Sequence, residues 1–193
     1  QLLLFTIHCP LPTKMRLALN GWFYNLPYTG TGLYLRQLLN HFPNDIEVIM
    51  VTPDEAQPAS RTTLHTAPAA RTSFGKVYFE QVAFPKACRD LKVDLAHIPY
   101  WAPPFNSPVP FVVTIHDVIP LILPDYNRAL KQRGYNAIVS AASQGATHII
   151  TVSQSAKQDI VKYLNIPPEK ISVTYEAASP DHFPRLGALV DIA

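Results

Sequence analysis

The run PFVVTIHD at residues 110–117 joins a buried strand to two titratable side chains. Residues 110–115 are the most strand-like stretch of the chain, because every side chain is apolar or β-branched. A continuous run of this kind is typical of a parallel strand that is covered on both faces. His116 and Asp117 follow at its carboxyl end, the edge where open parallel sheets bind their ligands. The run therefore predicts both a parallel sheet and the edge at which a site would lie.

Strands and helices alternate on both sides of this run, and each has the periodicity that its type requires. Further strands are predicted at 15–20, 45–52, 94–98, 148–152 and 171–175, with a weak one at 62–66. Helices are predicted from Gly30 to about Phe42, over 74–91 with a kink at Pro85, over 125–146, and from Ser153 to the prolines at 167–168. Residues 118–123 are predicted as a buried strand or a tight apolar turn. The alternation predicts an α/β fold, a single Rossmann-like domain on a doubly wound parallel sheet.

The two ends of the sequence do not fit this alternation. Residues 1–14 hold a short apolar stretch and two prolines, and we interpret them as a leader or an expression remnant, with a native edge strand as the alternative. A secretory signal would need a basic start and a longer apolar stretch. The domain is predicted to span residues 15–184. Residues 185–193 are predicted to begin an interdomain linker.

Composition and charge exclude several classes of function. The 193-residue chain has a formal net charge of only +2 and no block of Lys or Arg, so no nucleic-acid partner is predicted. Its two lone cysteines, Cys9 and Cys88, indicate neither a disulfide framework nor a zinc site. They favour a reducing compartment, which predicts a cytoplasmic location. No apolar run approaches the roughly 20 residues that a membrane-spanning helix needs.

Gly30, Thr31 and Gly32 form a short glycine loop at the start of a predicted helix. Glycines let the backbone approach an anion, and a helix N-terminus offers free N–H groups and partial positive charge. The loop is therefore a candidate for contact with a diphosphate, with an ordinary flexible turn as the alternative. It is a poor dinucleotide fingerprint, because the third glycine of GxGxxG would fall at Leu35.

His116 and Asp117 are the candidate catalytic pair. A histidine at this edge can accept or donate a proton near neutral pH, and the aspartate can bias its charge or cap the next turn. The alternative is a histidine bonded to the backbone as a structural plug. His97, His148 and His182 are scattered without the spacing of a metal site, so no metal is predicted.

Other candidates follow other predicted strands. Tyr100 and Trp101 follow the strand at 94–98 and could stack on a sugar or a base, or simply pack beneath their own loop. Ser153 follows the strand at 148–152 and suits a helix cap better than a nucleophile, since no GxSxG surrounds it. Glu176 follows the last strand and could contact a ligand or lie at a domain hinge.

Four segments are specific as an ordered set, although no single one is decisive. They are TGTGLYLR at 29–36, HIPY at 97–100, VTIHD at 113–117, and IITVSQS at 149–155 with PEKI at 168–171. In this order and at these separations they resemble the N-terminal domain of family 4 glycosyltransferases of the GT-B fold. The resemblance runs from about Met15 to Phe183.

The resemblance implies an enzyme with two Rossmann-like domains facing each other across a cleft. The N-terminal domain mainly holds the acceptor, a glycan or a lipid-linked molecule, and the C-terminal domain mainly holds the nucleotide-sugar donor. Transfer with retention of anomeric configuration is implied, with no metal and no cofactor besides the nucleotide-sugar co-substrate. The segment IPYWAPP at 98–104 beside the His-Asp pair favours mannose transfer into a bacterial polysaccharide. Peripheral association with the inner face of the membrane is expected of the full enzyme.

The resemblance also implies roles by position. It places the loop at 30–32 near the donor diphosphate, His116 and Asp117 beside the transferring sugar, and the remaining candidates at the acceptor or the sugar: Tyr100, Trp101, Ser153 and Glu176. The family's basic donor-phosphate residues and paired glutamates belong to a C-terminal domain that this chain does not contain. The chain alone is therefore expected to be inactive.

Three other functions stay open on the sequence. An epimerase acting on nucleotide-sugars can use the same two-domain fold, and it needs no acceptor. A non-catalytic module that binds a glycan or a protein partner would bind tightly without a second domain. A dinucleotide-dependent reductase is disfavoured by the incomplete glycine pattern.

Overall fold

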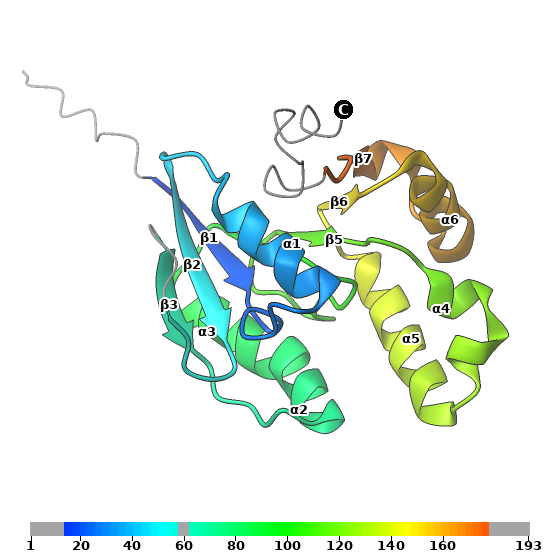
Figure 1. Ribbon diagram of the computed structural model, residues 1–193, viewed down its shortest axis with the longest axis horizontal. Coiled ribbons are helices and arrows are strands. Elements are labelled where there is room, and N and C mark those ends of the chain that lie inside the picture. Colours follow the sequence, from blue (N-terminus) through cyan, green and yellow to red (C-terminus); the bar gives the residue numbers. More distant parts are fainter. Residues whose placement is uncertain (1–13, 58–61, 178–193) are drawn as a thin grey trace, which may run out of the picture.

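A computed structural model describes residues 14–57 and 62–177 of the chain (Figure 1). The predicted linker at 185–193, and all but the last residue of the predicted leader, lie outside the described residues, as does His182. Within the described ranges no helix is long and apolar enough to cross a membrane.

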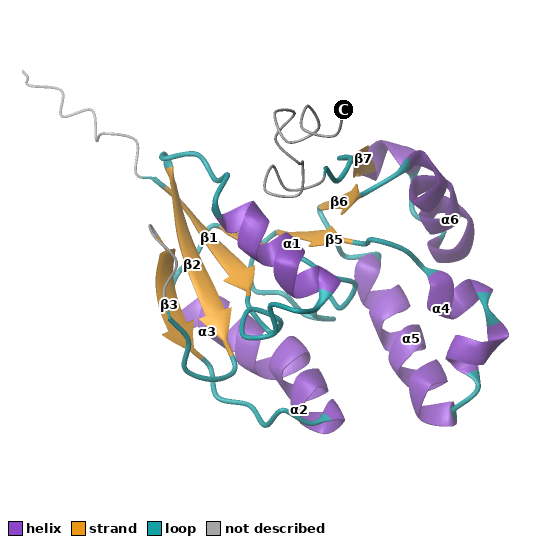
Figure 2. Cartoon of the chain, in the orientation of Figure 1, coloured by secondary structure: helices purple, strands orange, loops and turns teal. Residues whose placement is uncertain are grey.

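The described residues form one seven-stranded sheet in which every neighbouring pair is parallel (Figure 2). The strand order is β3-β2-β1-β4-β5-β6-β7. The predicted parallel Rossmann-like sheet is thus confirmed, and its order reverses between β1 and β4, the position at which such sheets open a crevice. The strands are β1 (Met15–Asn20), β2 (Ile46–Thr52), β3 (Thr62–Thr66), β4 (Leu95–Ile98), β5 (Phe111–Thr114), β6 (His148–Thr151) and β7 (Ile171–Val173).

Two apolar cores cover the two faces of the sheet, because alternate strand residues point to opposite sides. Leu17 and Leu19 of β1 pack with Leu35 of α1 (Gly30–Leu39), whereas Ala18 belongs to the opposite core. Figure 1 shows α1 lying over the part of the sheet that contains β1 and β2. The larger core lies under the other helices, which are α2 (Ser73–Tyr78), η1 (Phe79–Ala83), α3 (Phe84–Asp90), α5 (Leu130–Ser143) and α6 (Gln154–Leu164).

The predicted helix over 74–91 is present but contains a change of type. Its middle, η1, is a π-helical turn, in which the Phe84 N–H donates to the Phe79 carbonyl five residues back. Pro85 follows at the start of α3. Proline lacks the N–H of an α-helical bond and its ring collides with the carbonyl four residues earlier, so a wider turn accommodates it where a kink was predicted.

The predicted helix over 125–146 is wrong in its first turn. Pro124–Asn127 forms a separate 3₁₀ turn, η2, and the extended backbone of Ala129 precedes α5, which begins at Leu130. The apolar residues before it form the single turn α4 (Ile119–Ile122), so the predicted turn is present and the alternative strand is not. Only Val118 of that run is buried deeply, whereas Ile119 and Leu123 are exposed. An apolar run can line a surface as well as a core, which the sequence alone does not distinguish.

Candidate functional site

A pocket of about 440 Å³ lies at the carboxyl edge of the sheet. It brings together segments that follow β1, β4, β5 and β7, far apart in the sequence. Among the predicted site residues, only Gly32 and Ser153 do not line it. Its lining residues are Gly30, Thr31, Tyr100, Trp101, His116, Asp117, Pro120 and Glu176.

A larger hollow, of about 910 Å³, lies at the opposite edge of the sheet. It is lined by the end of α1 and the start of β2, among them Asn40, Pro43 and Ile46. Lys14 and Thr62 also line it, and each is the first described residue after a stretch that the structure does not describe. The smaller pocket is therefore the candidate site, because the polar groups converge there.

The start of α1 provides one side of the pocket. Thr29 is its N-cap, and the Thr29 Oγ1 accepts the Gly32 N–H at 3.0 Å. Within the described residues, the N–H groups of Gly30 and Thr31 have no acceptor. Free amides at a helix N-terminus are suited to binding an anion.

The two glycines of this loop serve different purposes. A Cβ on Gly32 would lie 2.1 Å from the Leu26 carbonyl oxygen and 2.9 Å from the Phe23 carbonyl oxygen, so this glycine is required by packing. Its amide is already bonded to Thr29, so a ligand contact through Gly32 is not supported. A Cβ on Gly30 would meet nothing within 4 Å, and the space beside Gly30 is open to a ligand.

His116 also lines the pocket, and it lies between two hydrogen-bond acceptors. Its Nδ1 is 3.2 Å from the Glu176 Oε1 and its Nε2 is 3.3 Å from the Pro99 carbonyl oxygen. The imidazole ring also packs edge-on against Tyr34, with the ring centroids 4.8 Å apart. A neutral imidazole donates from only one nitrogen, so only the protonated ring satisfies both contacts at once. The arrangement fixes the ring and leaves it at the pocket wall.

Asp117 and Ser153 both act on backbone groups of their own segments. The Asp117 Oδ1 accepts the Ile119 N–H at 2.9 Å, which caps the turn α4. The Ser153 Oγ accepts the Ala156 N–H at 3.0 Å as the N-cap of α6. Asp117 still lines the pocket, whereas Ser153 does not, so a sugar contact through Ser153 is not supported.

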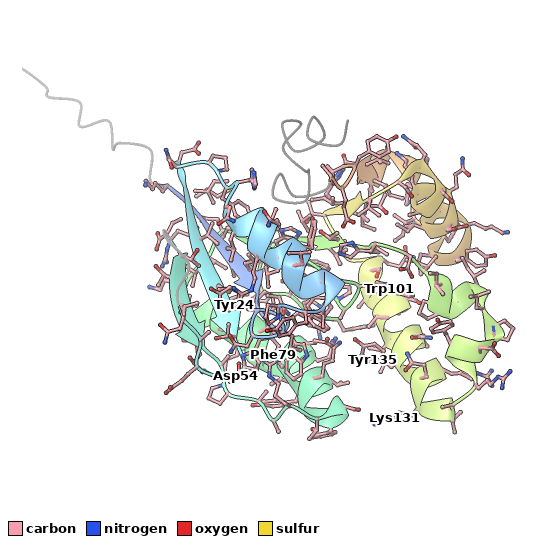
Figure 3. All side chains as sticks on the ribbon, viewed as in Figure 1. Tyr24, Asp54, Phe79, Trp101, Lys131 and Tyr135 are labelled. Atoms are coloured by element: carbon pink, nitrogen blue, oxygen red, sulfur yellow. The ribbon has the colours of Figure 1, made fainter. Side chains whose placement is uncertain are left out.

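The two predicted aromatic residues have used their polar groups within the protein. Tyr100 is buried, which agrees with the alternative that it packs beneath its own loop, and its hydroxyl donates to the Asn20 Oδ1 at 3.0 Å. Burial and the nearby carboxylate of Glu80 raise the pKa of Tyr100 well above its usual value. Trp101 is half-buried, and its Nε1 donates to the Ser143 Oγ of α5 at 3.1 Å (Figure 3). Both residues therefore offer the pocket ring surface rather than hydrogen bonds.

A hydrogen-bonded chain behind His116 was not predicted. The Tyr34 hydroxyl and the His97 Nε2 both approach the Thr114 Oγ1, at 3.3 Å and 2.9 Å. Burial, and next the charge of Glu176, raise the pKa of Tyr34. Thr114 lies two residues before His116, and Tyr34 lies one turn after Gly30. These two spacings are the signals that could have placed them near the site.

Within the described residues, no group of three or more His, Cys, Asp or Glu side chains could hold a metal ion. The polar groups of the pocket are the α1 amides, an imidazole and two carboxylates. This set can bind an anion at one side and orient hydroxyl groups at the other.

Comparison with known proteins identifies the family. Residues 28–182 match the model of Glycosyltransferase Family 4, which covers most of the chain. The chain belongs to this family. The resemblance noted in its sequence is thereby confirmed.

The relatives are longer than this family 4 chain. It is 30% identical over 71 residues to the O-antigen chain mannosyltransferase RfbU of Salmonella typhimurium, covering 37% of this chain and 20% of that protein. It overlaps a glycosyltransferase from Rickettsia africae with a TM-score of 0.41 and 13% identity, over 87% of this chain and 44% of that one. It overlaps the UDP-GlcNAc 2-epimerase of Methanocaldococcus jannaschii with a TM-score of 0.43 and 10% identity, over 82% of this chain and 44% of that one. Similarities this weak do not distinguish a transferase from an epimerase.

Alanine substitution is expected to change the free energy of unfolding differently at the two glycines of α1. Gly32→Ala should lower the free energy of unfolding by about 1–3 kcal/mol, because its methyl group would displace the backbone at Leu26. Gly30→Ala should leave it unchanged or raise it by up to about 1 kcal/mol, because its methyl group meets no protein atom and alanine restricts the unfolded chain. Urea unfolding followed by circular dichroism measures both. Equal effects at the two positions would contradict this account of the loop.

Because His97 is buried, we expect the protein to lose stability in acid. Burial lowers its pKa from 6.5 to about 4, so the unfolded chain binds a proton more readily than the folded one between these values. The free energy of unfolding should therefore fall as the pH falls from 6.5 to 4, by roughly 2–4 kcal/mol from this residue. His97→Gln, which cannot titrate, should lose less stability over this range in parallel denaturation curves. Identical pH profiles would show that His97 is not held neutral by the fold.

Proposed function

We propose that the chain is the acceptor-side domain of a retaining glycosyltransferase that moves mannose from a nucleotide-sugar to a glycan or lipid-linked acceptor in polysaccharide biosynthesis. The observation that carries the proposal is the pocket itself, where the free amides of Gly30 and Thr31 face the same space as His116 and Glu176. Membership of family 4 supports sugar transfer. The similarity to a mannosyltransferase supports mannose.

The charges of the reaction suit the two sides of this pocket. As the bond from the anomeric carbon to the donor phosphate breaks, the leaving nucleoside diphosphate gains negative charge, which the free amides and the helix dipole at Gly30 stabilise. The acceptor oxygen forms the new bond on the same face, and its proton passes to the departing phosphate. His116, held by Glu176 at Nδ1, orients the sugar while it is oxocarbenium-like by donating from Nε2, which exchanges its 3.3 Å contact with the Pro99 carbonyl oxygen for a sugar hydroxyl. No metal is required in this scheme.

The remaining donor contacts belong to a second domain in this proposal. The chain spans 20% of the length of the mannosyltransferase that it matches and 44% of each of the two solved structures. Basic groups for the diphosphate and carboxylates for the donor sugar would face the pocket from that domain. Closure of the two domains would exclude water and favour transfer over hydrolysis.

Activity of the full-length protein tests the proposal. With a mannose nucleotide as donor, transfer should require an added acceptor, and the isolated chain should show no turnover. His116→Ala should lower turnover by about 100-fold, a usual size for the loss of one positioned hydrogen-bond donor in the transition state. Gly30→Ala should raise the donor KM, because its methyl group occupies the space proposed for the diphosphate. The measurement is release of nucleoside diphosphate together with labelled product.

Gly134→Ala is the matched control for Gly30→Ala. Gly134 is exposed on α5, and a Cβ there also meets nothing within 4 Å, so its kinetics should equal those of the wild type. Conversion of the donor without an acceptor would instead identify an epimerase. Tight glycan binding by a chain that never turns over would identify a binding module.

We also propose that the full enzyme works at the inner face of the cytoplasmic membrane. The segment from α4 to the start of α5 exposes apolar side chains beside basic ones. Leu130 is 82% exposed and Tyr126 is 59% exposed, and Lys131 and Arg133 follow on the same helix. Apolar side chains next to Lys and Arg suit an interface with anionic lipid.

Binding of the 193-residue chain to lipid vesicles tests this location. The chain should bind vesicles that contain anionic lipid and should dissociate as salt is raised. Leu130→Ser should weaken binding about 30-fold, since it removes a side chain worth about 2 kcal/mol when buried. Phe74→Ser on α2 is the control, because Phe74 is equally exposed but lies outside this segment. Equal weakening by both variants, or no binding at all, would contradict the proposed surface.

A further inference from the structure

The π-helical turn η1 holds two neighbouring polar side chains that none of the proposed chemistry uses. Glu80 is fully buried and Gln81 is half-buried. Both bond to residues around the segment after β4, which supplies Tyr100 and Trp101 to the pocket. A π turn is rare and is often found beside functional sites.

Gln81 binds the loop after β4 at two points. Its Nε2 donates to the Pro103 carbonyl oxygen at 3.1 Å, and its Oε1 accepts the Phe105 N–H at 2.8 Å. The planar amide donates and accepts with one group, whereas an ionised carboxylate could only accept. Loop backbone in a protein is usually mobile unless it is bonded in this manner. Gln81 therefore fixes the loop two to four residues beyond Trp101.

Glu80 holds the other end of the same segment. Its carboxylate accepts hydrogen bonds from Lys76 and from the Tyr135 hydroxyl, the latter at 3.1 Å to Oε2. The Lys76 ammonium in turn lies 5.0 Å from the ring centroid of Tyr100 and 5.0 Å from that of Tyr135. A partly desolvated cation over two rings is a favourable contact. The pair thus supports the Tyr100 ring through the Lys76 ammonium.

Tyr135 joins this cluster to α5, which Figure 3 shows with Trp101 near its other end. Trp101 is bonded to Ser143 of α5, and Tyr135 is bonded to Glu80. Burial raises the pKa of Glu80 in spite of the adjacent Lys76. A buried carboxylate is costly, and one that is kept with full hydrogen bonding specifies a single arrangement of its neighbours.

We propose that Glu80 and Gln81 are positioning residues for acceptor binding: they hold the buried Tyr100 and the loop after β4, and thereby Trp101, whose half-buried ring forms the wall on which a sugar ring of the acceptor stacks. This inference rests on the proposed function only for the identity of the ligand. The positioning itself depends on the contacts of the described residues, so it can be tested without any reaction.

The first test uses fluorescence of the 193-residue chain. The sequence has two tryptophans, so Trp22→Phe leaves Trp101 as the sole emitter. In this background Gln81→Met should make Trp101 emission shift to longer wavelength and become easier to quench with acrylamide, because the loop is released. Gln81→Glu, which keeps the acceptor for the Phe105 N–H but loses the donor to Pro103, should give a smaller change of the same sign. The Gln81→Glu variant also provides the test if Gln81→Met does not fold.

Val82→Ala is the control in the same turn, because Val82 is exposed and its truncation should leave Trp101 emission unchanged. The second test uses the full-length protein. Gln81→Met should raise the acceptor KM about tenfold, as expected for the loss of one to two hydrogen bonds, with the donor KM unchanged. A general loss of structure would change both KM values and would lower the melting temperature.

The two tests fail separately. Unchanged Trp101 emission in both Gln81 variants, or equal rises in donor and acceptor KM, would overturn the positioning role. If the wild-type protein transfers no sugar, the proposed function fails, and the fluorescence alone then decides whether Gln81 holds the loop.

Discussion

Between β1 and β4 the sheet reverses the direction in which strands are added, and the position of the pocket depends on this reversal. The chains that leave β1 and β4 diverge to opposite faces, so a crevice opens above them. Across it the Tyr100 hydroxyl donates to Asn20, the last residue of β1. This bond joins the two halves of the sheet at the place where backbone pairing alone leaves the loops free. The start of α1 and the residues after β5 then line one pocket.

Much of this arrangement follows from local sequence. The strands were predicted closely, since each is a short apolar run in a parallel sheet with covered faces, and their carboxyl ends necessarily lie at one edge. Placing Gly30, His116 and Glu176 near one another required only that rule. The π turn before Pro85 and the late start of α5 were missed, because they depend on how the chain relieves a clash or leaves a loop. The sequence has no periodic signal for either.

The side-chain networks were beyond prediction for a different reason. The contacts of Thr114 with Tyr34 and His97 join a helix to two strands, and the Glu80 cluster joins a π turn to α5. From the sequence alone, each of these residues could equally be an ordinary core or surface residue outside any network. Only register and packing decide which polar atoms meet. The glycine loop shows the same limit, since nothing in its letters distinguishes the crowded Gly32 from the open Gly30.

The close approach of Gly32 to Leu26 has a mechanical consequence. With no room between the helix and the preceding loop, the first turn of α1 cannot slide or tilt against residues 23–29 without moving them as well. The two free amides are thus aimed in a set direction before any anion arrives. An anion that binds to these amides would not have to order a flexible glycine segment. The entropy cost of that ordering is already included in the folding of the chain. A rigid cradle of this kind favours quick release as much as capture, since nothing must unfold to let the anion go.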